Sequence, residues 1–529
     1  MSDEKISGSY YTPYDVITFM MNYLEKEKQD FRSVLEPSAG DGRFLSLLLK
    51  KAEHIDAVEL FEEKVYQIQK KYTNENLEVI HKDFIQFATE KQADYSLIIG
   101  NPPYINLKVM EREDIKKARE LCKIERLAES AMQNMWLAFV VGASRLVAKE
   151  GTIFFVLPME FLQVQYAEKL RGYLEKKFNT IHIITFRETL FEGIEQEVCL
   201  VYLANKQRKE EHILYEIYET VKSEKALHIN LIKKNKPLQK WSNAILSDEE
   251  ISLLKGQASQ WCKVGTMGTV APGIVTGGNK FFILTEEQVK KYNCEKYVLP
   301  IVQKSSFVDV NTMEINEEVL EKIKNVGKPV FLLDLAKAGK KLPKALQAYL
   351  EWSGEQEVQG IRLKERYKCA NRDPWYGVPI ANKGDVIFFK RYHILPRLYL
   401  NKANVHTTDA GYHIRLSEKY EADSFVFCFF NSLTLATCEY NGRYYGGGVS
   451  ELVPSEFKNI TVPYQKIAEE HIKELKEKFK AKVSIDEIVA FVNDKTIGKI
   501  LENEQIEKLE EIRKKLILRR ISSVRQNNV

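Results

Sequence analysis

The segment that most constrains the fold is the apolar run Tyr95–Gly100, which is followed directly by Asn101-Pro102-Pro103-Tyr104. A short apolar run that closes on glycine and proline predicts a buried β-strand. The tetrapeptide is therefore expected at the carboxyl end of a strand, which is where open α/β sheets bind their ligands.

The residues of the tetrapeptide suit a ligand that carries both an amine and a ring. Two consecutive prolines fix φ and remove two backbone donors, so the nearby carbonyl groups can face a ligand. The side-chain oxygen of Asn101 adds an acceptor for an exocyclic amine, and Tyr104 adds a flat face for a ring. The alternative is an ordinary turn, because Asn-Pro often opens one.

Strand-like and helix-like patterns alternate through the first part of the chain. Helical spacing is expected at residues 13–29, 43–51 and 135–149. Short apolar runs predict strands at 33–35, 55–60, 78–81, 95–100, 151–157, 181–186 and 198–204. This alternation predicts an α/β fold whose sheet is parallel or mostly parallel and carries helices on both faces.

The character of the chain changes after the first domain, which is predicted to span residues 1–206. Residues 207–244 are charged and are interpreted as a linker or bridging segment. Residues 245–465 combine short strand-like runs, aromatic residues and glycine-rich turns, which predicts a mixed α+β domain. Residues 466–529 return to charged helical patterns, with an apolar stripe at Leu509, Ile512 and Leu516.

Composition limits the class of protein without defining it. A chain of 529 residues with 44% hydrophobic residues is expected to form more than one packed domain. The formal net charge of +4 is too small to indicate nucleic acid by itself, so a basic surface would have to be local. The seven cysteines form no Cys-x-x-Cys pair, and we expect no metal and a reducing, cytoplasmic location. No segment approaches the roughly 20 apolar residues of a membrane span.

A second motif, Glu36-Pro37-Ser38-Ala39-Gly40-Asp41-Gly42, lies between a predicted strand and a predicted helix. Glu59 ends the next strand, where nucleotide-binding folds carry a ribose-binding acid. Carboxylates repel phosphates but suit an amine, a sulfonium charge and sugar hydroxyls, so S-adenosylmethionine fits better than a dinucleotide. The alternative is that Glu36 or Asp41 only caps the following helix.

Two weaker signals accompany this loop. Asp83 and Phe84 end the third predicted strand, where the acid can accept a hydrogen bond from an adenine amine and the ring can stack. Tyr11, Thr12 and Pro13 precede the first helix, which Thr12 can cap.

In this order the motifs resemble the γ group of DNA adenine-N6 methyltransferases of restriction–modification systems, over residues 1 to about 205. The resemblance implies a seven-stranded, Rossmann-like, S-adenosylmethionine-dependent methyltransferase domain followed by a mixed α+β DNA-recognition domain. It also implies that Tyr11, Thr12 and Pro13 border the methionine part of the cofactor. The other cofactor contacts that it implies are Glu36, Pro37, Ser38, Ala39, Gly40 and Asp41 for the amino and carboxyl groups, Glu59 for the ribose, Asp83 and Phe84 for adenine, and Asn101.

The resemblance further implies a mechanism. The Asn101 side chain and the Pro102 carbonyl would accept the two N6 hydrogens of a flipped-out adenine and direct its lone pair at the sulfonium methyl group. Pro103 completes the rigid turn, and Tyr104 would stack on the base together with Phe191. Phe191 could instead be a core residue. No general base is required.

Candidate DNA contacts in the second half are basic and aromatic residues near glycine-rich turns. They are Lys390, Arg391, Arg443, Tyr444, Gly446 and Gly447. The stretches Thr276–Lys280 and Glu365–Lys368 have the same character. Each could equally be a solvated surface or a packed strand.

Several functions stay open at this point. The tetrapeptide also occurs in enzymes that methylate a protein glutamine amide or an RNA base, and cytosine-N4 methylation is chemically close. A non-catalytic DNA-binding subunit and a fused nuclease are further alternatives. The large second half favours double-stranded DNA as the partner. We expect a monomer, and a separate cognate restriction endonuclease is a candidate partner whose presence the sequence does not establish.

Overall fold

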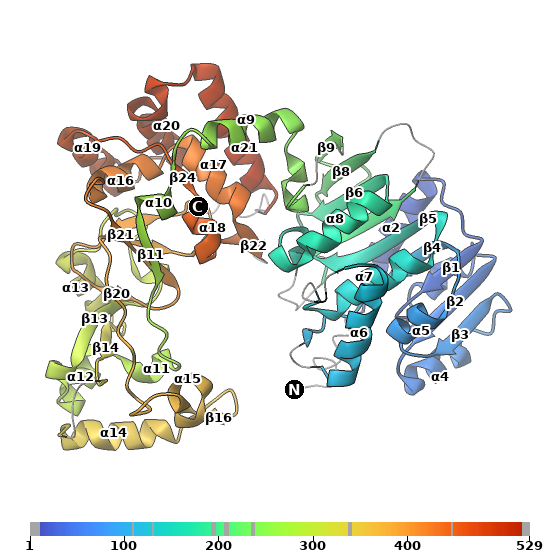
Figure 1. Cartoon of the computed structure of the whole chain (residues 1–529), viewed down its shortest axis with the longest axis horizontal. Coiled ribbons are helices and arrows are strands. Elements are labelled where there is room, and N and C mark those ends of the chain that lie inside the picture. The colour runs from blue at the N-terminus through green and yellow to red at the C-terminus, as the bar shows by residue number, and fades with distance from the viewer. Residues whose placement is uncertain are drawn as a thin grey trace. The chain divides into compact units, whose positions relative to one another are not determined.

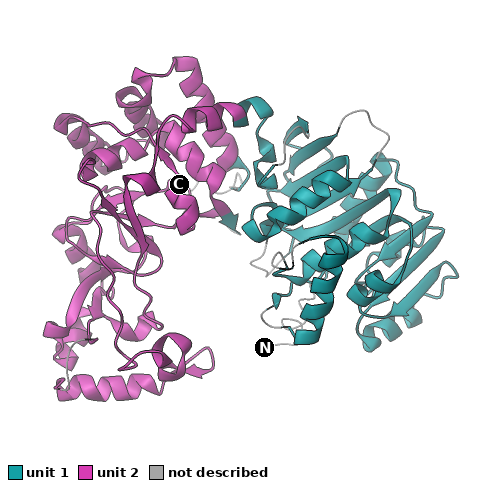
Figure 2. Cartoon of the chain, in the orientation of Figure 1, with its two compact units in different colours: residues 1–251, 444–448, 518–529 teal, residues 252–443, 449–517 magenta. Residues whose placement is uncertain are grey.

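The computed structural model describes residues 11–107, 110–127, 129, 132–191, 197–205, 211–233, 238–336, 341–445 and 448–520. The chain forms two compact units (Figure 2). Unit 1 comprises residues 1–251, 444–448 and 518–529, and unit 2 comprises residues 252–443 and 449–517.

Unit 1 is built on one nine-stranded mixed sheet with the strand order β3-β2-β1-β4-β5-β7-β6-β8-β9 (Figure 1). The strands from β3 to β5 are parallel, β7 is antiparallel to both β5 and β6, and β9 is antiparallel to β8. Their bounds are β1 Ser33–Glu36, β2 His54–Glu59, β3 Leu77–His81, β4 Tyr95–Gly100, β5 Val147–Pro158, β6 Thr180–Phe186, β7 Val198–Ala204, β8 His212–Tyr218 and β9 His228–Lys233.

Helices cover both faces of this sheet, since β4 and β7 are buried along their whole length. The helices are α2 Tyr14–Lys26, α3 Leu45–Leu48, α4 Glu62–Lys71, α5 Phe84–Glu90, α6 Arg112–Ile124, α7 Met135–Leu146 and α8 Glu168–Lys177. The apolar stripe of α2 belongs to one core cluster with the strands, as its helical spacing predicts. Pro13 rather than Thr12 occupies the N-cap position of α2, and no side chain caps this helix, so the predicted capping role of Thr12 is wrong.

All seven predicted strands are present, but the predicted number of strands in the sheet is wrong because β8 and β9 extend it. The interpretation of residues 207–244 as a linker is wrong, because β8 and β9 of the sheet lie in this range. β8 carries polar residues that are buried in the structure, namely His212 and Glu216. Glu216 accepts a hydrogen bond of 2.7 Å from the Tyr23 hydroxyl of α2, which compensates its burial.

Unit 2 combines small sheets with helices, as predicted for residues 245–465. Its two four-stranded sheets have the orders β11-β21-β17-β19 and β12-β14-β13-β20. The strands of this part of the chain are β10 Cys262–Lys263, β11 Gly268–Pro272, β12 Ile283–Leu284, β13 Val298–Val302, β14 Phe331–Leu333, β15 Glu357–Val358, β16 Ile361–Arg362, β17 Val386–Phe389, β18 Arg391–Tyr392, β19 Leu398–Leu400, β20 His406–Thr407, β21 Gly411–Leu416, β22 Arg443–Tyr445, β23 Val449–Glu451 and β24 Thr461–Val462.

The helices of the second half include the ones predicted near the C-terminus. They are α9 Asp248–Ala258, α10 Val264–Met267, α11 Asn279–Phe282, α12 Glu286–Tyr292, α13 Glu317–Asn325, α14 Lys344–Gly354, α15 Tyr367–Ala370, α16 Ala422–Phe429, α17 Ser432–Asn441, α18 Pro454–Lys458, α19 Glu469–Lys480, α20 Ile485–Lys495 and α21 Asn503–Leu518. The predicted stripe of α21 is fully buried at Leu509, Ile512 and Leu516.

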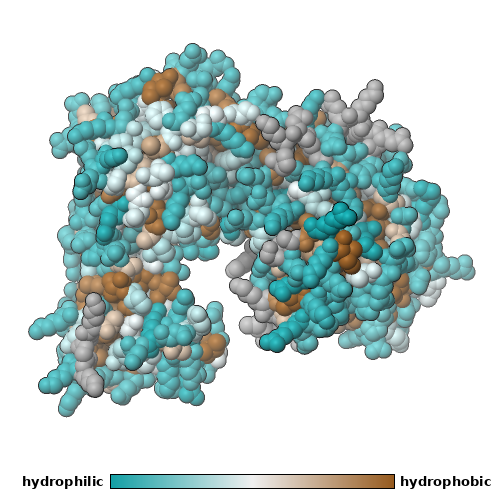
Figure 3. All heavy atoms as spheres, viewed as in Figure 1, coloured by the Kyte–Doolittle hydropathy of each residue, from teal (hydrophilic) through white to brown (hydrophobic). Residues whose placement is uncertain are grey.

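Hydrophilic residues cover most of the visible face of the molecule, with smaller hydrophobic patches among them (Figure 3). None of the helices in the described residues is both long enough and apolar enough to cross a membrane.

Candidate active site

The predicted motifs meet at the carboxyl edge of the unit 1 sheet. Glu36 ends β1, Glu59 ends β2 and Gly100 ends β4, and β1 lies between the other two strands. Their side chains and the turns that follow them are therefore neighbours, as expected for parallel strands.

The glycine-rich loop is held by Glu59. Gly40 has a φ of +58° and donates its N–H to Glu59 Oε2 at 2.8 Å. The other carboxylate oxygen, Oε1, accepts a hydrogen bond of 3.0 Å from the Phe61 N–H. Glycine is required at Gly40 and Gly42 because both adopt positive φ values, which other residues rarely do. Two backbone donors thus fix the position of an acid that is only 5% exposed.

The loop is in contact with the tetrapeptide. The Ser38 hydroxyl donates a hydrogen bond of 3.1 Å to the Asn101 carbonyl. A side chain at Gly100 would come within 3.3 Å of the Pro37 ring, so glycine permits this close approach. The predicted cofactor loop and the predicted catalytic asparagine therefore form one site.

The side chain of Asn101 is oriented by Tyr104. The Tyr104 hydroxyl lies 2.7 Å from Asn101 Oδ1 and 3.0 Å from the Val156 carbonyl of β5. Burial raises the pKa of Tyr104, so the hydroxyl stays protonated and can donate to either oxygen. This contact fixes the acceptor oxygen of the amide at the edge of the sheet.

Two buried polar atoms at this edge have no hydrogen-bond partner among the described residues. They are Oε2 of Glu36, which is 1% exposed, and Oγ1 of Thr12, which is 4% exposed. Burial raises the pKa of the Glu36 carboxyl well above its usual value, and the nearby Glu59 and Asp41 raise it further. Because unsatisfied buried polar atoms are costly, these atoms are suited to a ligand that brings an ammonium group and hydrogen-bond donors. The amino group of S-adenosylmethionine fits this requirement.

Arg43 and Lys64 are site residues that sequence reasoning missed. Arg43 donates to the Thr12 carbonyl at 3.3 Å and to Asp41 Oδ2 at 2.7 Å. The Tyr11 ring lies near both cations, 5.1 Å from the Arg43 guanidinium carbon and 5.5 Å from the Lys64 ammonium. Arg43 directly follows Gly42, so its position in the loop was a usable signal, whereas Lys64 is brought in by α4.

We predict that Arg43→Ala weakens S-adenosylmethionine binding about 5- to 10-fold, because the variant loses hydrogen bonds that join Thr12 to the loop. Isothermal titration calorimetry checks this value. Arg32→Ala is the control, since Arg32 forms an exposed ion pair with Asp30 and should leave the affinity unchanged. Equal affinities for the two variants would show that Arg43 does not organise the site.

The structure gives Asp83 and Phe84 mainly structural roles. Asp83 is the N-cap of α5 and accepts a hydrogen bond of 2.8 Å from the Ile85 N–H. The Phe84 ring is 2% exposed and stacks on Phe139 of α7, with a centroid distance of 4.7 Å. Stacking of Phe84 on adenine stays a prediction, and it requires that the ring be uncovered when the cofactor enters. The contact of Asp83 with adenine stays a prediction.

Phe191 is 4% exposed and belongs to the core cluster that also includes α2. Tyr104 is partly buried and packs against the same cluster. Stacking of Phe191 on a base stays a prediction, and it requires that the ring be uncovered when a base enters.

The predicted DNA contacts of the second half have partners within the protein. Lys390 Nζ lies 3.6 Å from one oxygen of Glu451, and Arg391 Nε lies 3.1 Å from the other. Arg443 donates to Glu456 at 2.9 Å. A role for these three cations in DNA binding stays a prediction, and the carboxylates reduce their net charge.

Tyr444 cannot contact DNA as predicted, because it is 1% exposed. Its backbone N–H donates to the Gln163 side chain at 3.0 Å, and its ring centroid lies 5.0 Å from the guanidinium carbon of Arg519. These residues all belong to unit 1. The predicted contacts Gly446 and Gly447 lie outside the described residues.

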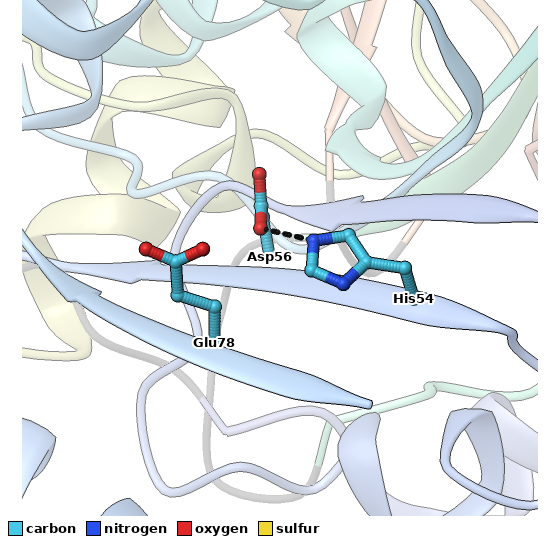
Figure 4. A group of neighbouring side chains, drawn as sticks. All are labelled: His54, Asp56 and Glu78. Atoms are coloured by element: carbon cyan, nitrogen blue, oxygen red, sulfur yellow. Dashed lines mark hydrogen bonds and ion pairs between the residues drawn. The ribbon is translucent and has the colours of Figure 1, made fainter. Parts of the chain in front are cut away.

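Among the described residues, His54, Asp56 and Glu78 form a group with the spacing of metal ligands (Figure 4). Asp56 is already engaged, since it lies 2.8 Å from His54 Nε2 and 2.7 Å from Lys91 Nζ and also accepts a hydrogen bond from the Tyr95 hydroxyl. Because the lysine ammonium supplies the positive charge that a metal ion would bring, we interpret His54, Asp56 and Lys91 as a polar network in which two partly exposed side chains satisfy one buried acid.

The fold and the site together define an S-adenosylmethionine-dependent methyltransferase. The family model for the Eco57I restriction-modification methylase matches residues 34–191, and the model for the C-terminal domain of the type II methyltransferase M.Eco57I matches residues 238–497. These matches identify the chain as a type II restriction–modification methyltransferase of the Eco57I-like kind.

Similar proteins agree with this class. The type II methyltransferase M.AccI of Acinetobacter calcoaceticus is 23% identical over 488 residues, which cover 86% of this chain and 85% of that protein. M.HincII of Haemophilus influenzae is 28% identical over 202 residues, which are 37% of each chain. The type IIL restriction-modification enzyme MmeI, solved in complex with DNA, has the same fold with a TM-score of 0.62 at 14% identity, covering 98% of this chain and 80% of that chain.

Proposed function

We propose that the protein transfers a methyl group from S-adenosylmethionine to N6 of an adenine that is flipped out of double-stranded DNA. The main support for this proposal is the contact between the cofactor loop and Asn101, in which the Ser38 hydroxyl donates a hydrogen bond to the Asn101 carbonyl. It brings an amide acceptor next to the residues that suit the methyl donor. The restriction–modification class, and the DNA complex of MmeI, support DNA as the substrate.

The N6 amine of adenine is a poor nucleophile because its lone pair is delocalised into the ring. Asn101 Oδ1 and the Pro102 carbonyl would accept the two N6 hydrogens and favour a pyramidal nitrogen. When bound, S-adenosylmethionine supplies an electrophilic methyl group. The N6–carbon bond would form as the sulfur–carbon bond breaks, the sulfur would keep the electron pair and leave as a neutral thioether, and a proton would pass from N6 to solvent. Positioning and electrostatics carry the rate in this account, and no residue is assigned as a general base.

Three other substrates fit the same site geometry. Cytosine N4 is also an exocyclic amine, and a planar amide or an RNA base presents the same chemical problem to Asn101. The extent of unit 2, which covers about 260 residues, favours a large duplex substrate over a protein amide. Base-flipping follows from the position of N6 inside the duplex stack.

Expression in a host without DNA methylation, followed by single-molecule sequencing of its genome, tests the proposal. We expect N6-methyladenine in one short sequence motif. Unmodified DNA in cells that contain folded, cofactor-binding protein would refute the proposal, as would methylation confined to cytosine.

Two Tyr104 variants distinguish the contribution of the ring to methylation from that of the hydroxyl. We expect Tyr104→Ala to lower kcat/KM about 5- to 150-fold, because base–aromatic stacking is worth ~1–3 kcal/mol. Tyr104→Phe keeps the ring and loses the hydroxyl that contacts Asn101 Oδ1 and the Val156 carbonyl, so its loss should stay below about 10-fold. Steady-state methylation of duplex DNA checks both values. A larger loss for Phe than for Ala would contradict a stacking role.

A further inference from the structure

One end of unit 2 carries an exposed aromatic ring among basic residues. Figure 1 shows α11, α14, α15 and β16 at this end. Residues 361–372 contain five basic residues and one acid, namely Arg362, Lys364, Arg366, Lys368 and Arg372 with Glu365. Tyr367, at the start of α15, is 78% exposed.

Two of these arginines have structural roles. Arg366 donates to the Gly277 carbonyl at 2.6 Å, and Arg372 donates to the carbonyls of Thr276 and Val275 at 2.7 and 2.8 Å. The loop at 275–278 is thereby fastened to the segment at 366–372. These two guanidinium groups spend part of their hydrogen-bonding capacity on backbone carbonyls of the protein.

The packing between these two segments is close. A side chain at Gly278 would come within 2.5 Å of Leu363, and one at Gly277 within 3.2 Å of Lys368. Cys369 and Leu363 are fully buried beneath the surface. Tyr367 is therefore presented by a rigid support, which lowers the entropy lost when its ring contacts a ligand.

Three lysines at this end of unit 2 differ in their partners. Lys364 pairs with Glu355 and is partly neutralised. Lys280 and Lys368 are exposed and form no ion pair with a carboxylate among the described residues. Lys368 Nζ lies 5.6 Å from the Tyr367 ring centroid. Two cations and one aromatic ring thus remain open to solvent, and we call Lys280, Tyr367 and Lys368 the basic–aromatic surface.

We infer that the basic–aromatic surface binds the double-stranded DNA substrate, with Lys280 and Lys368 on phosphates and the Tyr367 ring against a base or sugar. Exposed lysines without carboxylate partners suit a phosphate backbone, and an exposed ring among cations is typical of nucleic-acid contacts. Because the net charge of the whole chain is only +4, attraction to DNA phosphates has to come from local groups of basic residues such as this one. This inference rests on the proposed function, because that function supplies the DNA.

Fluorescence anisotropy with a labelled duplex, measured over a range of salt concentrations, tests the inference. In the double variant Lys280→Ala/Lys368→Ala, the slope of log affinity against log salt should fall by about 2, since each phosphate contact contributes ~0.9. The loss should be similar for any duplex sequence. Tyr367→Ala should weaken binding about 10-fold.

Matched controls come from exposed residues elsewhere. Lys322 of α13 and Tyr66 of α4 have exposed fractions of 71% and 65%, and their alanine variants should bind as the wild type does. All variants are first checked for thermal stability and S-adenosylmethionine binding. Wild-type affinity and salt slope in the folded surface variants would overturn the inference. So would unchanged DNA binding with altered self-association, which would point to a protein partner.

The proposed function and this inference fail in different ways. Cytosine methylation in the genome map would refute adenine as the target, while the anisotropy slopes would still support or contradict the surface. Wild-type protein that binds no duplex at all would contradict both.

Discussion

Asn101→Ala is expected to lower the methylation rate by at least about 10²–10³-fold while S-adenosylmethionine binding stays within about tenfold of the wild type. The variant removes the acceptor that should hold one N6 hydrogen, and loss of one group that stabilises a transition state typically has this effect. The backbone carbonyl that accepts from Ser38 is retained. Tyr104 keeps the Val156 carbonyl as an acceptor, so no buried donor is left unpaired.

Single-turnover methylation and calorimetric titration with the cofactor together measure this separation. Ser38→Ala is the control, since it removes the neutral hydrogen bond to the Asn101 carbonyl and should reduce the rate less than about 10-fold. If Asn101→Ala kept turnover within a few-fold of the wild type, the amide would have no catalytic role.

Glu36→Gln should weaken S-adenosylmethionine binding about 10- to 100-fold and, in the absence of cofactor, stabilise the protein at neutral pH. The loss of affinity follows because a hydrogen bond to a charged group is worth ~1.5–3 kcal/mol. The gain in stability follows because the variant no longer buries a carboxylate whose Oε2 lacks a partner.

The gain in stability of Glu36→Gln should depend on pH in one direction. Burial, with Glu59 and Asp41 nearby, raises the pKa of Glu36 in the folded protein above its ordinary value of 4.5. Between these two pKa values the folded state binds more protons than the unfolded state, so wild-type stability falls as pH rises. The stability advantage of Glu36→Gln should therefore be smallest below about pH 4.5 and grow with increasing pH.

The affinity of the wild type for S-adenosylmethionine should rise with pH over the range in which its stability falls. An ammonium group beside Glu36 favours the ionised carboxylate, so wild-type affinity rises with pH through the same interval and the affinity of Glu36→Gln does not. Thermal unfolding and calorimetry at several pH values measure both trends. Glu53→Gln, at an exposed position, is the control. Parallel pH curves for the wild type and Glu36→Gln would exclude this role for Glu36.

The cofactor edge of the sheet could be predicted from sequence because its signals are local. Glycines with positive φ, paired prolines and short apolar runs specify the turns and strands on which Gly40, Asn101 and Glu59 lie. The same reasoning missed β8 because His212 and Glu216 look like surface residues. Their burial depends on Tyr23 and His182, which lie far away in the sequence.

Errors at single residues have the same origin. Tyr444 is buried, with its backbone bonded to Gln163 and its ring beside Arg519, so segments distant in the sequence cover the side chain that was expected to contact DNA. Arg391 is exposed as predicted, but Glu451 is paired with it. A basic or aromatic residue type alone does not reveal whether its side chain already pairs or packs with another part of the protein.

Identifying the base that receives the methyl group tests the proposed adenine-N6 methylation most directly. Purified protein is incubated with duplex DNA and isotopically labelled S-adenosylmethionine, and the DNA is then digested to nucleosides and analysed by mass spectrometry. We predict label in N6-methyldeoxyadenosine alone, and loss of this label with Asn101→Ala. Label in a cytosine derivative, or equal labelling by the variant, would contradict this prediction.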